Sequence, residues 1–136
     1  MADLYSAAVR TLTDHKLNGL NDAINVLALD DPGVGGACHV YRLDLTSAPD
    51  GPGITAATGH LEIRFQNGPI HEAGINGVSG EALLTVLLDR LRGFQTGQFA
   101  CRENAVALTH LETALMWLQK RTRDRMARGV EGTHKV

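Results

Sequence analysis

The hydrophobic positions of this chain change their period near Ser79. Before it, residues 23–29 form an apolar and β-branched run, and residues 38–45 and 61–65 alternate between apolar and polar side chains. Alternation with a period of two is typical of strands that bury one face. After it, apolar residues recur every three or four positions, which is typical of helices. The order predicts an α+β fold, with a small N-terminal antiparallel β-sheet followed by a long C-terminal helical hairpin.

Three local features of the first half carry more detailed expectations. Residues 1–12 have apolar side chains at helical spacing and predict a short helix. The apolar side chains of residues 61–65 should point inward from their strand. Asn67-Gly68 is a strong hairpin signal because both residue types tolerate positive φ. We therefore expect a returning strand over residues 69–73. Its first residue is a proline, which has no backbone N–H and is tolerated at the start of a strand.

Two helices are predicted in the second half. Ser79 can cap the first helix with its side-chain oxygen. The core of that helix, residues 83–88, is apolar nearly all round and should be buried on more than one side. Residues 93–97 should form the connection, and the second helix should run over residues 102–128 with Gly129 as its C′ residue. This second helix would be roughly 40 Å long, which is more than one small domain needs.

Two apolar rows run along the predicted second helix. The rows are Leu108, Leu111, Leu115 and Leu118 on one face, and Ala107, Ala114 and Trp117 on a neighbouring face. The first row has the spacing of helices that pack side by side. One interpretation is that the first row packs on the preceding helix and the second row on the sheet. The other is that one row pairs with a second subunit, which the length of the helix favours.

Length and charge restrict the classes of function. With 136 residues the chain fits one domain, in which residues 21–77 form the sheet part, residues 79–128 the helical hairpin and residues 129–136 a tail. A net charge of −2 disfavours DNA and RNA as partners and leaves small anions, bound by a local cluster of cations. The first twenty residues contain no long apolar stretch, so we expect no signal peptide, no membrane span and a cytosolic location.

A cluster of cations near the end of the second helix is a candidate binding surface. Five cations occur within residues 120–128, and Arg121, Arg125 and Arg128 share one helical face. Cations at a helix C-terminus are stabilising through the helix dipole alone. A guanidinium can also bind phosphate oxygens and stack on a base. An alternative hypothesis is a protein-binding module that docks an acidic partner through this cationic helix end.

Catalytic and metal chemistry have little support in the sequence. Cys101 begins the second helix and could serve a thiol-dependent enzyme, but no histidine or carboxylate is placed by the sequence to act as its base. None of the six histidines has a metal-binding spacing. The glycines of residues 33–36 lack the spacing of a dinucleotide fingerprint. We therefore expect no catalytic residue, no metal and no cofactor.

Four stretches of the chain resemble those of a known family. They are Phe65-Gln66-Asn67-Gly68-Pro69, Gly74-Ile75-Asn76-Gly77-Val78, Phe99-Ala100-Cys101-Arg102-Glu103-Asn104-Ala105 and Arg128-Gly129-Val130-Glu131-Gly132-Thr133-His134. The chain resembles the phage anti-Thoeris sponge proteins from about Asn21 to its end, and its helical hairpin also resembles the smaller anti-CBASS sponges. The resemblance implies a protein that binds glycocyclic ADP-ribose, the Thoeris messenger, without cleaving it, in the cytoplasm of the infected bacterial host. Some members also hold cyclic di- or trinucleotides of CBASS immunity.

The resemblance also implies the residues of the site. In the family, an aromatic residue of the hairpin connection and an arginine late in the long helix hold the adenine between them. These positions match Phe94 and Arg121, with Asn104 as a further polar contact. Further positions are implied by charge or by backbone donors near a diphosphate, namely Arg102, Arg125, Arg128, Gly129, Val130, Gly132 and Thr133. One departure is Gln98, where the family pattern leads us to expect a proline.

The two principal residues of this implied site are far apart along one helix. Arg121 lies about nineteen residues past the start of the second helix, roughly 28 Å along the axis from Phe94. One small ligand cannot span that distance within a single chain. We therefore expect a homodimer with antiparallel long helices, in which two-fold symmetry creates two equivalent pockets. Among relatives, three such dimers assemble into a hexamer.

Overall fold

A computed structural model describes residues 9–45 and 59–136 of the chain. The chain divides into two compact units, Met1–Phe65 and Gln66–Val136. The first unit contains the sheet and the second contains the two long helices, so the predicted α+β fold is confirmed. The expectation that residues 1–136 form one domain stays a prediction.

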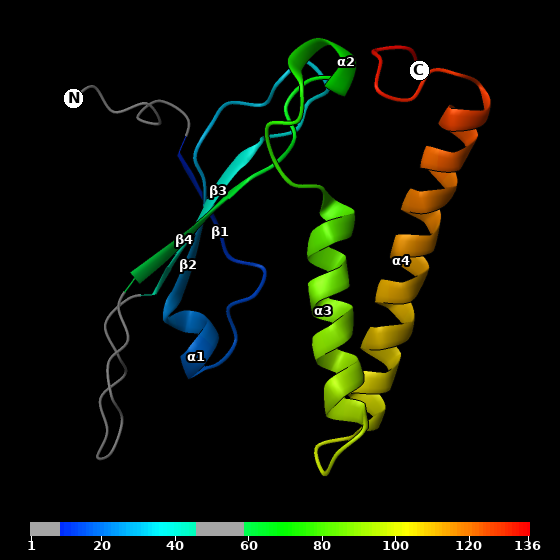
Figure 1. Ribbon diagram of the computed structural model, residues 1–136. Coiled ribbons are helices and arrows are strands. Elements are labelled where there is room, and N and C mark those ends of the chain that lie inside the picture. The colour runs from blue at the N-terminus through cyan, green and yellow to red at the C-terminus, as the bar shows by residue number, and fades with distance from the viewer. Residues whose placement is uncertain (1–8, 46–58) are drawn as a thin grey trace. The chain divides into compact units, whose positions relative to one another are not determined.

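The first unit is built around a four-stranded antiparallel sheet in which sequential strands are neighbours (Figure 1). Its strands are β1 (Arg10–Leu12), β2 (Ile24–Ala28), β3 (Val40–Leu45) and β4 (Gly59–Arg64), and a short helix, α1 (Gly19–Asp22), lies between β1 and β2. The register places Tyr41 opposite both Ala28 and Ile63. Ala28, Leu29 and Cys38 are buried, so the core lies at this end of the strands.

The strand β1 corrects the expectation of an N-terminal helix. Residues 10–12 pair with β2, with Arg10 opposite Ala28, and residues 1–8 lie outside the described residues. Forming the first turn of a short helix is unfavourable, because several backbone dihedral angles are fixed for a single hydrogen bond. Pairing with β2 gives the N–H and C=O groups of residues 10–12 hydrogen-bond partners without that cost.

The inward orientation predicted for residues 61–65 holds only at one end of the strand. Ile63 and Phe65 are half-buried, and the Phe65 ring lies edge-on to Tyr41 with the ring centroids 5.7 Å apart. Leu61 is 59% exposed, so its predicted burial was wrong. The reason is its position, because Leu61 pairs with Leu43 and lies two residues farther from the buried end of the sheet.

The predicted returning strand after Asn67-Gly68 is also wrong. Gly68 does adopt a positive φ of 90°, but the following segment forms a short helix, α2 (Ile70–Ala73). Side-chain amides close the loop instead of a strand ladder. Asn76 accepts from the Asn67 N–H at 2.8 Å and donates to its carbonyl at 2.7 Å, and the Asn76 N–H donates to the Gln66 side chain at 2.9 Å.

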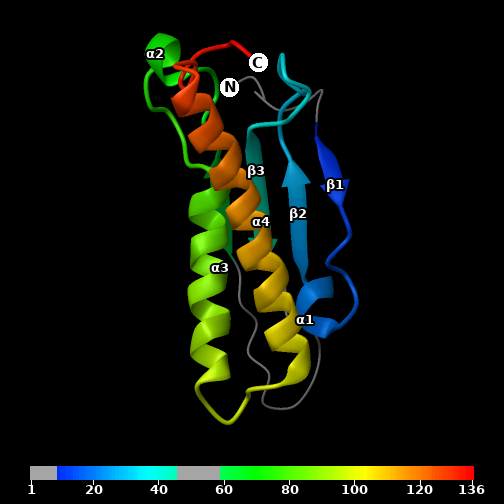
Figure 2. The same ribbon diagram turned by 90° about the vertical axis from the view of Figure 1, so that its right-hand side faces the viewer.

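The second unit contains the predicted helical hairpin, with α3 (Gly80–Gln95) and α4 (Arg102–Ala127) side by side (Figures 1 and 2). Ser79 caps α3 as predicted, because its hydroxyl accepts from the Ala82 N–H at 3.1 Å. Gly129 follows α4 with a φ of 71°, which confirms the predicted C′ residue. The connection starts later than predicted, because α3 continues through Gly93 to Gln95.

One of the two apolar rows of α4 packs on α3. Leu108, Leu111 and Leu115 are half-buried, and Leu88 of α3 is only 1% exposed. The other row is open, since Trp117 is 59% exposed. Packing of the first row on α3 is confirmed for these three leucines, whereas Leu118 is 38% exposed. That the second row packs on the sheet stays a prediction.

The expected burial of residues 83–88 on more than one side was wrong. Val86 is 64% exposed and Leu87 is 48% exposed. The physical reason is that α4 covers a single stripe of α3, which contains Leu88. None of the described helices combines the length and the apolar character needed to cross a membrane.

Candidate functional site

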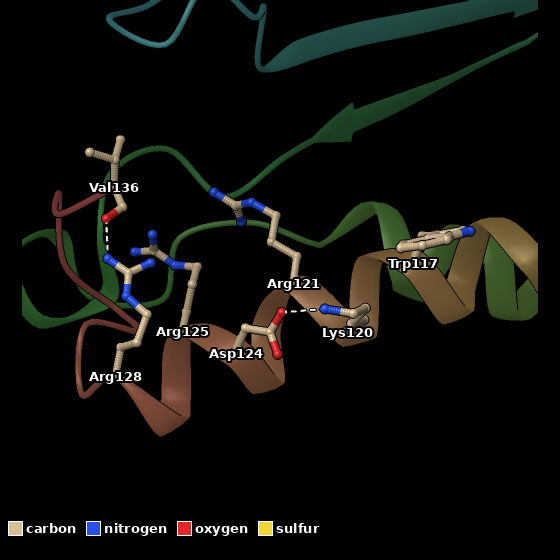
Figure 3. A pocket seen from close by; sticks show the side chains of 7 residues that line it. All are labelled: Trp117, Lys120, Arg121, Asp124, Arg125, Arg128 and Val136. Atoms are coloured by element: carbon tan, nitrogen blue, oxygen red, sulfur yellow. Dashed lines mark hydrogen bonds and ion pairs between the residues drawn. The ribbon is translucent and has the colours of Figure 1, made fainter.

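A pocket of about 440 Å³ lies at the C-terminal end of α4 (Figure 3). Its lining combines one aromatic ring, four cations, one carboxylate and the end of the tail, contributed by Trp117, Lys120, Arg121, Asp124, Arg125, Arg128 and Val136. The helical spacing explains the arrangement. Residues four and seven positions apart share a face, and the side chains of Arg121, Arg125 and Arg128 rise from one side of α4 in Figure 3.

Two of these cations are engaged with single partners. Lys120 forms an ion pair with Asp124, at 2.6 Å between Nζ and Oδ2. Arg128 donates to the backbone carbonyl of Val136. Both contacts are drawn as dashed lines in Figure 3. The charges of Lys120 and Asp124 therefore offset each other, and of the four cations only Arg121 and Arg128 have no carboxylate partner among the described residues.

Arg125 is buried and donates to four acceptors, all in the tail. Its Nε contacts the Glu131 carboxylate at 2.9 Å, and one terminal nitrogen contacts the Lys135 carbonyl at 2.6 Å. Its other terminal nitrogen donates to the carbonyls of Val130 and Thr133, each at 3.0 Å. A guanidinium has five N–H donors, so this side chain has little capacity left for a ligand. The sequence grouped Arg125 with the ligand contacts, and its geometry suits the role of a clamp for the tail.

The tail is also fixed to α2. Gly132 has a φ of 79°, and its carbonyl accepts from the His71 N–H at 3.3 Å. A Cβ atom at this position would lie 2.6 Å from Cδ2 of His71, so only glycine fits. Nδ1 of His134 lies 3.0 Å from Oε2 of Glu72. Figure 1 shows the same arrangement, with the tail beside α2.

The tail contains backbone N–H groups without a partner among the described residues. Val130 donates to the Arg125 carbonyl and Thr133 donates to the Val130 carbonyl. The backbone N–H groups of Glu131 and Gly132 have no partner within the described part of the chain. Consecutive backbone donors are suited to the oxygens of a phosphate. Of the four tail residues that the resemblance implied, the N–H groups of Gly129, Val130 and Thr133 are bonded within α4 and the tail, and only that of Gly132 is free among the described residues.

Arg121 differs from the other cations of the pocket. It is exposed and, among the residues that the structure describes, it has no hydrogen-bond or ion-pair partner. Trp117 lies one helical turn before it and lines the same pocket. We had assigned Trp117 only to an apolar row, although its spacing of four residues from Arg121 is visible in the sequence.

The remaining candidates lie at the other end of the hairpin. Phe94 is half-buried, and its ring lies edge-on to Phe99 with the centroids 6.5 Å apart. Asn104 donates its backbone N–H to Sγ of Cys101 at 3.5 Å. Arg102 is exposed at the first position of α4. The described structure thus groups Phe94, Asn104 and Arg102 near the hairpin tip and leaves them far from the pocket of Arg121.

The groups that could support thiol or metal chemistry do not converge in the structure. Cys101 is exposed and unpaired, and no bond from it to a histidine or carboxylate is present in residues 9–45 and 59–136. Across those same residues, no group of three histidine, cysteine or acidic side chains could hold a metal ion.

Two comparisons with known proteins found similar sequences. Residues 58–123 match the family model described as the Acb2/Tad1 hairpin domain. A relative named Thoeris anti-defense 1, from Bacillus phage SBSphiJ7, is 56% identical over 73 residues. The match covers 54% of this chain and 51% of the relative, so the chain spans about half the length of that curated relative.

Proposed function

We propose that the chain is a phage anti-defence protein of the Acb2/Tad1 family that binds a cyclic nucleotide immune signal and sequesters it intact, on the ground that residues 58–123 match the Acb2/Tad1 hairpin model. The observation that carries the proposal is Arg121, a guanidinium without a partner among the described residues, in a cationic pocket at the end of α4. A guanidinium can bind phosphate oxygens and stack on a purine. The protein would act in the cytoplasm of the infected bacterial host.

The ligand that fits this chemistry best is glycocyclic ADP-ribose. Its diphosphate would lie near Arg121 and the N–H groups of Glu131 and Gly132, and its adenine would stack on the Arg121 guanidinium. The name of the similar phage protein, which refers to Thoeris, favours the same messenger. Cyclic di- and trinucleotides of CBASS immunity contain the same groups and are further candidate ligands. Sequestration needs no catalytic residue, because the signal is removed by binding alone.

The second aromatic contact requires another copy of the chain. Arg121 lies about nineteen residues into α4, roughly 28 Å from its start, whereas Phe94 lies just before that start. A homodimer with antiparallel α4 helices would bring Phe94 of one copy to Arg121 of the other. The exposed row that contains Trp117 supplies an apolar surface for such a pair.

The proposed function is tested by recovering the ligand. Purified protein is incubated with glycocyclic ADP-ribose and a panel of cyclic di- and trinucleotides, washed and denatured by heat, and the released compounds are identified by mass. We expect one or more compounds to be released unchanged. Turnover of glycocyclic ADP-ribose at catalytic rates, or no retention of any compound, contradicts sequestration.

The shared pocket is tested by mixing two inactive variants. Phe94→Ala and Arg121→Ala are refolded together, so that about half of the dimers are mixed, and each mixed dimer has one intact pocket and one pocket that lacks both residues. We therefore expect about a quarter of the wild-type site count to return. If each pocket belongs to one chain, no mixture restores binding. Zero recovery with mixed dimers confirmed by mass refutes the shared pocket.

A further inference from the structure

The ring of Phe94 has a cationic neighbour that the sequence did not single out. Arg90 lies one turn earlier on α3, and its Cζ atom is 5.0 Å from the centroid of the Phe94 ring. This distance is within the range of a cation–π contact. Phe99 lies edge-on to the same ring, with an interplanar angle of 78°. The Phe94 ring therefore has two neighbours: the Arg90 guanidinium lies over one of its faces, and the Phe99 ring lies edge-on to it.

Arg90 makes no competing contact that would explain its position. It has no hydrogen-bond or ion-pair partner in the part of the chain that the structure describes. Arg92, two residues later, pairs with Glu112 of α4 at 3.2 Å. The two arginines of this turn thus have different roles: Arg92 joins the two helices, and Arg90 lies over an aromatic ring.

We propose that Arg90 is a positioning residue that covers one face of Phe94 and holds the ring ready for a base to stack on its other face. This inference rests on the proposed function. With one face covered, a planar base has a single face of Phe94 to stack on. A ring already held in place loses less side-chain freedom when the ligand binds, which raises affinity. The complete arrangement is a stack of four layers: Arg90, Phe94, the base and Arg121 of the other copy.

A double-mutant cycle tests whether Arg90 acts through Phe94. Arg90→Met removes the charge and keeps an apolar stem, and Phe94→Leu removes the ring and keeps an apolar surface. Affinity for glycocyclic ADP-ribose is measured by calorimetry for the wild type, both single variants and the double variant. We expect Arg90→Met to weaken binding about two- to tenfold, because the freed ring must then be immobilised when the ligand binds. In the Phe94→Leu background, the same change should have no further effect.

The controls separate positioning from general effects. Arg92→Met removes the same charge from the same turn and should leave affinity unchanged. Arg90→Lys keeps a cation over the ring and should retain most of the affinity. Thermal unfolding followed by circular dichroism should give the same midpoint for Arg90→Met and the wild type, because Arg90 is exposed.

The outcomes distinguish this inference from the proposed function. Equal weakening by Arg90→Met with and without the Phe94 ring would show that Arg90 contacts the ligand itself, and would overturn the positioning role. Unchanged affinity in Arg90→Met, or in Phe94→Leu, would overturn it as well while leaving sequestration intact. A wild-type protein that binds neither glycocyclic ADP-ribose nor any cyclic nucleotide of the panel contradicts the proposed function.

Discussion

Replacing Arg125 with methionine removes the guanidinium that holds the tail and keeps the apolar stem of the side chain. The charge is buried, and it is satisfied by the Glu131 carboxylate and by the backbone carbonyls of Val130, Thr133 and Lys135. Arg125→Met leaves all four acceptors without this donor. We expect the tail to detach from α4 while the hairpin stays folded, because the helices pack through Leu88 and the apolar row of α4.

The magnitude follows from the burial of the two charges. Breaking a buried ion pair by removing one partner costs about 3–5 kcal/mol when the remaining charge stays buried. Glu131 is 40% exposed and can be hydrated once the tail moves, so the loss should be smaller. We expect the free energy that holds the tail in place to fall by about 2–3 kcal/mol. Local opening would then be roughly 30- to 150-fold more frequent, since each 1.4 kcal/mol is a factor of ten.

Hydrogen–deuterium exchange of single amides measures this opening. The Thr133 amide donates to the Val130 carbonyl at 3.1 Å, and the His71 amide donates to the Gly132 carbonyl at 3.3 Å. Both amides should exchange faster in Arg125→Met by the predicted factor. Leu115, in the middle of α4, should be unaffected and serves as an internal reference.

A matched control uses a neighbouring arginine. Arg123 is exposed and has no partner in the described structure, so Arg123→Met removes the same charge without touching the tail. Wild-type exchange at Thr133 and His71 in Arg125→Met would refute the clamp. Lower ligand affinity with unchanged tail exchange would show that Arg125 contacts the ligand directly.

Three further predictions test the hairpin, the tail and the pocket. Leu88→Ala should lower the free energy of unfolding by about 2–5 kcal/mol in chemical denaturation, because Leu88 is 1% exposed, and a loss below 1 kcal/mol would contradict its place in the seam. Gly132→Ala should speed exchange at His71, since its Cβ would lie 2.6 Å from that ring, whereas Gly97→Ala, with open space around it, should not. Trp117 is the single tryptophan, so its emission should change when glycocyclic ADP-ribose binds; saturation without any change would place the ligand elsewhere.

The helices were the part of the fold that the sequence predicted best, because their signals are local. The cap at Ser79, the C′ glycine at Gly129 and the apolar row between them depend only on nearby residues. Two errors occurred where a pairing partner outside the segment decides its structure. Residues 10–12 form a strand because they pair with β2, and residues 70–73 form a helix because Asn76 closes the loop.

The candidate site was predictable to a similar extent. Helical spacing places Arg121, Arg125 and Arg128 on one face, and the pocket contains all three. The same spacing cannot tell which arginine is already occupied, because the acceptors of Arg125 belong to a tail that folds back on α4. Trp117 was missed as a lining residue because an aromatic in an apolar row is first interpreted as a packing residue.

The partners of the four cations within the chain indicate which of them an anion would bind. A ligand that engaged Lys120 would compete with Asp124, and one that engaged Arg128 would compete with the Val136 carbonyl. Arg125 would have to release the tail, and with it the N–H groups that could serve the same ligand. Arg121 can accept a phosphate or a base without breaking any bond of the described structure. The side chain that loses least on binding is therefore the one that the family resemblance assigned to the adenine, and the proposed contact with Phe94 would have to come from another copy of the chain.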